Sequence, residues 1–266
     1  MDEVNRTLFI PLCGKSLVSR KGIILRDPDA ERIWEAEGFP LPGRSRSKWL
    51  AYNMAMRARV FDDWTDAMLE EHPDALVLHL GCGLDSRCAR VKKPYKNWID
   101  CDFPGVIAVR RRYFREGGGC RMAALDASDP AQLKTLPDAG EAILILEGIS
   151  MYLTQDELRA LFRTLEAKYA RLYVLMDVYT ELGAKASKYK NPVNDVGVTR
   201  LYGVDDIGAL LEGLRCRFRT EHSFTPPALT AELKPAERFV FRLLYTGKLY
   251  RRFYRLLELE AAPSGE

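Results

Sequence analysis

A short apolar run that ends in a pair of glycines constrains this chain more than any other feature. Residues 75–80 are Ala-Leu-Val-Leu-His-Leu, and Gly81, Cys82 and Gly83 follow directly. An apolar run of this length bounded by glycine is typical of a strand that is buried on both faces. Glycines at such a strand end allow a tight turn and a close approach of the backbone to a ligand. The segment therefore predicts a buried strand and a ligand-binding turn of an open α/β sheet.

Further apolar runs alternate with helical patterns along the chain. We expect more strands at 96–102, 121–126, 142–147 and 171–177, helices at 106–115 and 155–169, and an edge strand at 217–222. Strands that alternate with helices indicate a parallel sheet with right-handed crossovers. The predicted fold class is α/β, with a Rossmann-like, doubly wound sheet.

Both flanks of this sheet are predicted to be helical parts of the same domain. Residues 1–72 form an N-terminal helical cap, in which Asp27 and Pro28 mark a helix start. Residues 226–266 are basic and aromatic and are predicted to form a helical extension. A chain of 266 residues can build one large core, so we expect a single domain with its Rossmann-like part at 73–225.

Acidic residues at the predicted strand ends are candidates for binding a cofactor. Asp102 lies 19 residues after Gly83, where a carboxylate can accept hydrogen bonds from ribose hydroxyls, although Asp100 is a competing candidate. Leu125 and Asp126 follow the third strand, where they could flank an adenine ring. The alternative for Asp126 is an Asx turn.

Four other positions carry charges or a phenol group that suit a binding site. Glu147 ends an apolar strand, so it needs a partner such as a cofactor ammonium or an arginine. Tyr152 could line an acceptor pocket or pack in the core. Arg57 and Arg59, on a helix predicted at 47–71, could clamp a carboxylate or pair with the acidic residues that follow them.

The glycine pattern also restricts the kind of cofactor. The turn is G-x-G, and Arg87 stands where a third glycine would be expected. A dinucleotide needs the wider glycine clearing for its pyrophosphate, so the shorter turn favours a nucleoside cofactor without phosphates. A nicotinamide oxidoreductase and a non-catalytic cofactor-binding sensor or scaffold stay as alternatives.

Composition bears on partners and location. A formal net charge of +3 gives no argument for a nucleic-acid partner, and no apolar run reaches the ~20 residues of a membrane span. The six cysteines form no C-x-x-C pair and there are three histidines, so we expect no metal site and a reducing cytoplasm. The basic, aromatic C-terminal segment suits an anionic partner, such as a carrier protein or a membrane face, but packing of an amphipathic helix is the favoured interpretation.

Four segments taken in order resemble the leucine carboxyl methyltransferase family. They are 57–63, 80–87, 98–104 and 147–153, and the chain is most similar to the bacterial polyketide O-methyltransferase branch, of the tetracenomycin type. Weaker similarity at 7–12, 24–28 and 202–206 extends the resemblance over nearly the whole chain. Cys82 and Asp100 depart from the family, which usually has Ala and Glu at these positions.

The resemblance implies a class I methyltransferase fold and S-adenosylmethionine as the cofactor. It assigns the parts of the cofactor as follows: the methionine part to Gly81, Cys82 and Gly83, the ribose to Asp102, the adenine to Leu125 and Asp126, the amino group to Glu147, and the carboxylate to Arg57 and Lys15.

The sequence constrains the methyl acceptor less than the cofactor. We expect the acceptor to be a small molecule or a protein C-terminus. A carboxylate is ionised at neutral pH and needs no general base, whereas a phenol, with a pKa near ~10, would need one. The few histidines therefore favour a carboxylate acceptor over a phenol. We expect Arg59 or Tyr152 to orient the acceptor oxygen.

Overall fold

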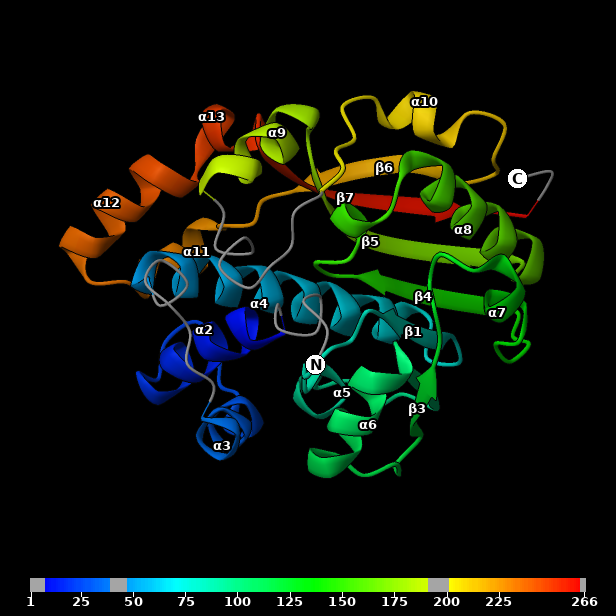
Figure 1. Ribbon diagram of the computed structural model, residues 1–266, viewed down its shortest axis with the longest axis horizontal. Helices are drawn as coiled ribbons and strands as arrows, with labels where there is room; N and C mark the ends of the chain where they lie inside the picture. Colours follow the sequence, from blue (N-terminus) through cyan, green and yellow to red (C-terminus); the bar gives the residue numbers. More distant parts are fainter. Residues whose placement is uncertain (1–7, 39–46, 191–200, 264–266) are drawn as a thin grey trace.

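The computed structural model describes residues 8–38, 47–190 and 201–263 of the chain (Figure 1). Its centre is a seven-stranded sheet with the order β3-β2-β1-β4-β5-β7-β6 in the described part of the chain. The strands are β1 Leu76–Leu80, β2 Asn97–Asp102, β3 Cys120–Ala124, β4 Glu141–Leu146, β5 Arg171–Tyr179, β6 Arg217–His222 and β7 Tyr254–Ala261. Strands β1 to β5 are parallel, and β7 runs antiparallel to both of its neighbours.

Helices cover both faces of this sheet, which confirms the doubly wound α/β fold. They are α2 Phe9–Arg20, α3 Pro28–Glu37, α4 Lys48–Glu71, α5 Arg87–Arg90, α6 Pro104–Tyr113, α7 Pro130–Lys134, α8 Gln155–Lys168, α9 Glu181–Lys190, α10 Ile207–Leu211, α11 Pro227–Ala231, α12 Pro235–Tyr245 and α13 Gly247–Arg251. A 3-10 turn, η2, spans Ser150–Tyr152.

The two faces of the sheet follow from the alternation of side chains along each strand. Leu78 and Leu144 point to the face that is covered by α8, α7 and α10. Val77 and Ile143 point to the other face, where Phe61 of α4 packs against them in a second apolar cluster. Strand order reverses between β1 and β4, and ligands of open α/β sheets bind at such a point, outside the carboxyl ends of the strands.

Helix α2 packs against α4, and α3 packs against α2, so that the two N-terminal helices form a cap at the lower left of Figure 1. The predicted helix start at Asp27 and Pro28 is confirmed, because the Asp27 side chain accepts a hydrogen bond from the Ala30 amide at 2.8 Å. In the described residues, no helix has both the length and the apolar character needed to cross a membrane.

The prediction of a wholly helical C-terminal segment is wrong for its last part. Residues 254–261 form β7, which is inserted between β5 and β6. Tyr254, Leu256, Leu259 and Ala261 are buried, and less buried residues stand between most of them, so the period is that of a strand rather than a helix. The residues just before this strand are also aromatic, so the change from a helical to a strand period is not evident in the sequence. Strand β3 also ends earlier than expected, at Ala124.

Candidate active site

A cavity of ≈ 600 Å³ lies at the point where the strand order reverses. This volume is within the range of small-molecule sites, about 300–1,000 Å³. The carboxyl ends of β1 and β4 contribute the glycine turn, Glu147 and Gly148, whereas the cap contributes Lys15 and helix α4 contributes Arg57. The C-terminal helices and β7 close the cavity with aromatic side chains.

The glycine turn after β1 requires glycine at two positions. Gly81 and Gly83 have φ of 69° and 53°, a left-handed conformation that L side chains rarely adopt. A Cβ atom on Gly81 would lie 2.8 Å from Cδ1 of Ile149, and one on Gly83 would lie 2.9 Å from Cδ2 of Leu8. The backbone of this turn therefore lines the cavity with no side chain in the way.

Asp102 and Asp100, the two candidates for the ribose, have different surroundings. Asp102 accepts hydrogen bonds from the backbone amides of Gly83 and Phe103, each at 2.8 Å, and this ties it to the glycine turn. A carboxylate that accepts two hydrogen bonds keeps lone pairs for a further donor. Asp100 is 1% exposed and is held by Arg110. The geometry therefore favours Asp102.

The pair of Asp100 and Arg110 supports the glycine turn from behind. Nη1 of Arg110 donates to the carbonyl oxygens of Gly83 and Asp85, at 3.1 Å and 2.6 Å. Burial disfavours the ionised form of Asp100, but the charge of Arg110 and the hydrogen bonds of His79 and Trp98 together outweigh this and lower the pKa of Asp100 from 3.8 to about 2. This pair is a structural element of the turn.

Asp100 also lies beside Cys88 and Cys120, so that one potential ligand atom of each residue falls within 4.8 Å of the others. The hydrogen bond between Cys120 and Cys88, together with burial, raises the pKa of the Cys120 thiol, so this thiol stays protonated at neutral pH. The guanidinium of Arg110 already neutralises the one carboxylate of this group. We assign no metal ion to it.

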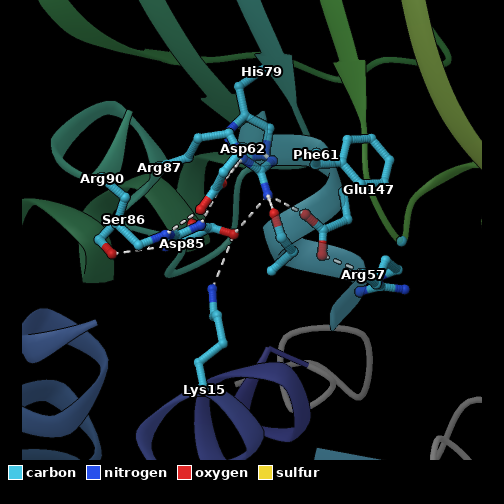
Figure 2. Close-up of polar contacts among 12 residues, drawn as sticks. Lys15, Arg57, Phe61, Asp62, His79, Asp85, Ser86, Arg87, Arg90 and Glu147 are labelled. Carbon is cyan, nitrogen blue, oxygen red and sulfur yellow. Dashed lines mark hydrogen bonds and ion pairs between the residues drawn. The ribbon is translucent and has the colours of Figure 1, made fainter. Parts of the chain in front are cut away.

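A dense group of buried charges borders the cavity, and most of its members are labelled in Figure 2. We call it the ion cluster, and it consists of four cations and five carboxylates: Lys15, Arg57, Arg87, Arg90, Asp27, Asp62, Asp85, Glu147 and Asp177. Its carboxylates exceed its cations by one when all are ionised. A ligand with one net positive charge would compensate this excess, and S-adenosylmethionine, with its sulfonium, ammonium and carboxylate groups, is such a ligand.

Arg87 is the centre of the ion cluster in Figure 2 and is fully buried. Its Nε donates to Asp62 at 2.7 Å, and its Nη2 donates to Glu147 and lies 3.5 Å from Asp85. The face of Phe61 lies 5.3 Å from the guanidinium carbon. Arg87 therefore joins the glycine turn, helix α4 and the end of β4.

Arg57 connects helix α4 to the ends of β4 and β5. Its Nε donates to Glu147 at 2.9 Å, and its Nη1 donates to Asp177 at 2.8 Å and to the Tyr254 hydroxyl at 2.6 Å. Within the described residues, no hydrogen bond is found for Nη2 of Arg57, which lies 3.2 Å from the Cβ position of Gly148. Arg57 lines the cavity, so this nitrogen can serve a ligand carboxylate.

Lys15 reaches from the cap into the ion cluster. Its ammonium group lies 2.9 Å from Asp85, and only 3% of the residue is exposed. Figure 2 shows the side chain extending from α2 toward Asp85. A buried ion pair between α2 and this turn fixes the cap over the cavity.

The ion cluster should make the stability of the protein sensitive to acid. Burial disfavours ionised Glu147, but the charges of Arg87 and Arg57 outweigh it and lower the pKa of Glu147 from 4.5 to about 2. A lowered pKa stabilises the fold above the unfolded-state pKa, and this contribution is lost as pH falls through the folded-state pKa. We expect Tm to fall between about pH 4.5 and pH 2.

Thermal unfolding over this pH range measures the effect. Glu147→Gln should show a smaller decline than the unchanged protein, whereas Glu71→Gln, at an exposed position at the end of α4, should show the same decline. If Tm declined equally in the Glu147→Gln variant and the unchanged protein, Glu147 would not be a source of the acid sensitivity.

The other half of the cavity is aromatic. Its walls include Tyr179 of β5, Tyr245 of α12, Tyr250 of α13, Phe253 and Tyr254. The ring centroids of Tyr245 and Tyr250 are 5.7 Å apart, and those of Tyr179 and Tyr254 are 4.8 Å apart. Such a surface suits a flat, apolar ligand.

Asn53 stands between the charged and the aromatic halves. It lies on α4 four residues before Arg57 and therefore on the same face of the helix. Its Oδ1 accepts a hydrogen bond from the Tyr250 hydroxyl at 3.1 Å, whereas its buried Nδ2 has no partner among the described residues. A buried donor without a partner calls for an explanation, such as a ligand oxygen.

His79 is the histidine that lines this cavity in the described structure. Its Nδ1 lies 3.3 Å from Asp100, and its Nε2 lies 3.4 Å from a guanidinium nitrogen of Arg87. Arg87 can only donate, so Nε2 accepts and Nδ1 carries the proton. Both ring nitrogens are therefore used within the protein.

The structure brings together most of the residues that the sequence suggested. Lys15, Arg57, Glu147, Tyr152 and the glycine turn, including Cys82, line the cavity. Asp102 and Leu125 lie just outside its lining, where the Leu125 amide donates to the Asp102 carbonyl oxygen. Asp126 accepts from the amide and hydroxyl of Ser128, which is the alternative Asx turn.

Arg59 does not belong to this group. It lies two residues after Arg57, about 200° around the helix, and it does not line the cavity. It donates to Asp63 at 2.8 Å and to the Ile24 carbonyl oxygen at 3.3 Å. The structure therefore gives Arg59 no place beside an acceptor.

Sequence reasoning missed most of the ion cluster and the aromatic half of the cavity. The glycine pattern shows Arg87 only as a residue in the place of a third glycine, although an arginine that follows a buried strand and its turn needs acidic partners. Asp177 ends the strand that the sequence predicts at 171–177, so it could have been found by the rule used for Glu147, although β5 continues to Tyr179. Asn53 and Tyr250 carried no local signal.

Comparison with known proteins places the chain in a family. The family model for Leucine carboxyl methyltransferase matches residues 5–166. The chain belongs to this family. The chain is also similar to the tetracenomycin polyketide synthesis O-methyltransferase TcmP of Streptomyces glaucescens, with 30% identity over 262 residues, 96% of this chain and 95% of TcmP.

Another relative matches a shorter part of the chain, and solved structures support the fold. The S-adenosyl-L-methionine-dependent methyltransferase dpfgK of Gibberella zeae is 36% identical over 129 residues, 45% of this chain and 43% of dpfgK. A putative methyltransferase of Thermobifida fusca has a TM-score of 0.58 at 13% identity, with 89% of this chain and 88% of that one covered. Magnesium protoporphyrin IX methyltransferase of Synechocystis, with bound SAH, has a TM-score of 0.51 at 14% identity, with 88% and 94% covered.

As a member of this family, the protein is an S-adenosylmethionine-dependent methyltransferase, as the sequence predicted. The nicotinamide oxidoreductase alternative is thereby set aside. The cytoplasmic location and the domain boundaries stay predictions.

Proposed function

We propose that this enzyme methylates a carboxylate oxygen of a small aromatic molecule. The donor supplies an electrophilic sulfonium methyl group when it is bound. A carboxylate oxygen that displaces the thioether sulfur gives a methyl ester and S-adenosylhomocysteine, with no proton to be moved. The aromatic half of the cavity supports a flat acceptor, and the relative TcmP is named for the synthesis of a polyketide.

The donor is proposed to occupy the charged half. Glu147 would bind its ammonium group, and Arg57 together with Lys15 would bind its carboxylate. The turn of Gly81, Cys82 and Gly83 leaves room for the methionine part. We assign the ribose to Asp102 and the adenine to Leu125 and Asp126.

The main observation in support of a carboxylate acceptor is the amide nitrogen of Asn53, which has no hydrogen-bond partner among the described residues. Its Nδ2 offers two N–H donors at the junction of the two halves, where the acceptor oxygen must meet the methyl group. His79 has no nitrogen left to act as a base toward a phenol. The chain's own contribution is then to bind and align, and alignment can supply ~7–11 kcal/mol of the barrier.

The chemical stability of the product tests this proposal. The enzyme is incubated with methyl-labelled S-adenosylmethionine and matched pairs of aromatic carboxylic acids and phenols. We expect label in a methyl ester, which mild alkali releases as methanol. Label that survives alkali would identify an ether and overturn the carboxylate proposal, and tight donor binding with no turnover on either panel would favour the non-catalytic alternative.

Variants at the junction should separate acceptor binding from donor binding. Asn53→Leu should raise the KM for the acceptor about tenfold, because a hydrogen bond to a charged group is lost. Tyr152→Phe should lower kcat if its hydroxyl orients the acceptor oxygen.

The donor Kd, measured by calorimetry, should stay unchanged in both variants. An increase in donor Kd in Asn53→Leu with no change in acceptor KM would instead assign this amide to the donor carboxylate. Arg59→Gln, on the other side of α4, is the matched control and should leave both constants unchanged.

A further inference from the structure

The outer face of helices α12 and α13 exposes large apolar side chains. Phe239 and Leu243 are 73% and 71% exposed, and Leu249 is 64% exposed. Leu244 and Val240 are exposed beside them. We call these five residues the apolar ridge. Figure 1 shows α12 at the outer edge of the molecule, away from the sheet.

Helix α12 is apolar on two opposite faces. Phe241 is fully buried and Tyr245 lines the cavity, so these residues anchor the inner face. Phe239 and Leu243 are four residues apart and share the outer face. Because the inner face of α12 is already packed, the apolar residues on its outer face are not needed for the core, and a large exposed apolar patch marks a binding surface.

The ridge is flanked by cations. Arg242, Lys248 and Arg252 are exposed, and no ion pair is found for them in the described structure. Nearby acids are already engaged, since Glu237 pairs with Lys48 and Glu221 pairs with Arg251. The surface therefore combines apolar side chains with a net positive charge.

We propose that α12 and α13 dock this enzyme on an anionic lipid surface. A helix with a basic polar flank and exposed Leu and Phe side chains lies in the plane of such a surface, with its apolar face among the acyl chains. The cations beside the ridge would meet lipid phosphates. No membrane span is required.

Charge and shape argue against other occupants. In a symmetric dimer of this chain, the same patch would meet itself, and Arg242 and Lys248 would face like charges. An acidic protein would satisfy the charges but would need a groove that fits protruding side chains, whereas fluid lipid adapts to them. Because Tyr245 and Tyr250 of the same helices line the cavity, docking would hold the cavity close to the bilayer.

Sedimentation with vesicles tests the proposal on the full chain, independently of methyl transfer. We expect binding to vesicles of phosphatidylcholine with phosphatidylglycerol, weak binding to phosphatidylcholine alone, and release at high salt. Arg242→Gln and Lys248→Gln should each weaken binding about fivefold. Phe239→Gln with Leu243→Gln should weaken it about a hundredfold. Phe218→Gln, at another exposed apolar position, on β6, is the control and should bind normally.

Three results would overturn the proposal. The first is failure to bind either kind of vesicle. The second is a dimer in light scattering that the Phe239→Gln, Leu243→Gln variant dissociates, which would assign the ridge to a second copy. Binding to an acidic carrier protein in place of vesicles, lost in the same variant, would assign it to a protein partner. Circular dichroism of each variant shows that the fold is retained.

Discussion

Replacing Arg87 with methionine should lower the free energy of unfolding by about 3–5 kcal/mol, because one partner of a buried ion network is removed. Asp62, Asp85 and Glu147 would then stay buried without their shared cation. Methionine fills part of the space but donates no hydrogen bond. Urea unfolding followed by circular dichroism measures the change.

Two further variants make this result interpretable. Arg87→Lys keeps the charge but loses the second hydrogen-bonding arm, so it should fold and lie between the methionine variant and the unchanged protein. Arg59→Met removes a half-buried ion pair with Asp63, which lies on the same helix, α4. This change should lower the free energy of unfolding by at most about 1 kcal/mol. An Arg87→Met variant as stable as Arg59→Met would show that the ion cluster contributes little.

Glu147→Gln should weaken binding of S-adenosylmethionine about thirtyfold or more, since loss of one partner of a buried charge pair costs at least ~2 kcal/mol. The proposed ammonium site loses its charge, and Arg57 loses the carboxylate that orients its Nε. Equilibrium dialysis with labelled donor measures Kd in the folded protein.

A ligand without the amino-acid part identifies the cause. Methylthioadenosine carries neither the ammonium nor the carboxylate, so Glu147→Gln should leave its Kd unchanged. Glu141→Gln, at the other end of β4, is the matched control and should bind both ligands normally. Equal losses for both ligands in Glu147→Gln would point to a collapsed site and contradict a specific ammonium contact.

Local patterns were sufficient to predict the frame of the site. Gly81 and Gly83 follow a wholly apolar run, and the structure has a buried strand and a left-handed turn there. Glu147 directly follows another apolar strand, β4, and is found in contact with two arginines. In each case the signal and its consequence lie within a few residues, because strand burial and turn geometry are local properties of a sequence.

The C-terminal segment shows where such patterns fail. Tyr250 and Tyr254 stand in a run of aromatic and basic residues that suits a helix, yet one lies on a short helix and the other begins β7. Which of these forms depends on the open edge of β5, with which β7 pairs over residues 172–179. No property of the segment alone identifies that partner.

The sequence by itself determined the sheet, the glycine turn, the family and so the cofactor. The tertiary structure decided which charges meet: Arg87 joins acids 25 and 60 residues away, and Asn53 meets Tyr250 across 197 residues. The tertiary structure also places Arg59 outside the cavity and leaves the apolar ridge exposed. Contacts between distant residues depend on the assembled fold, because side chains meet only after the strands and helices that carry them have packed.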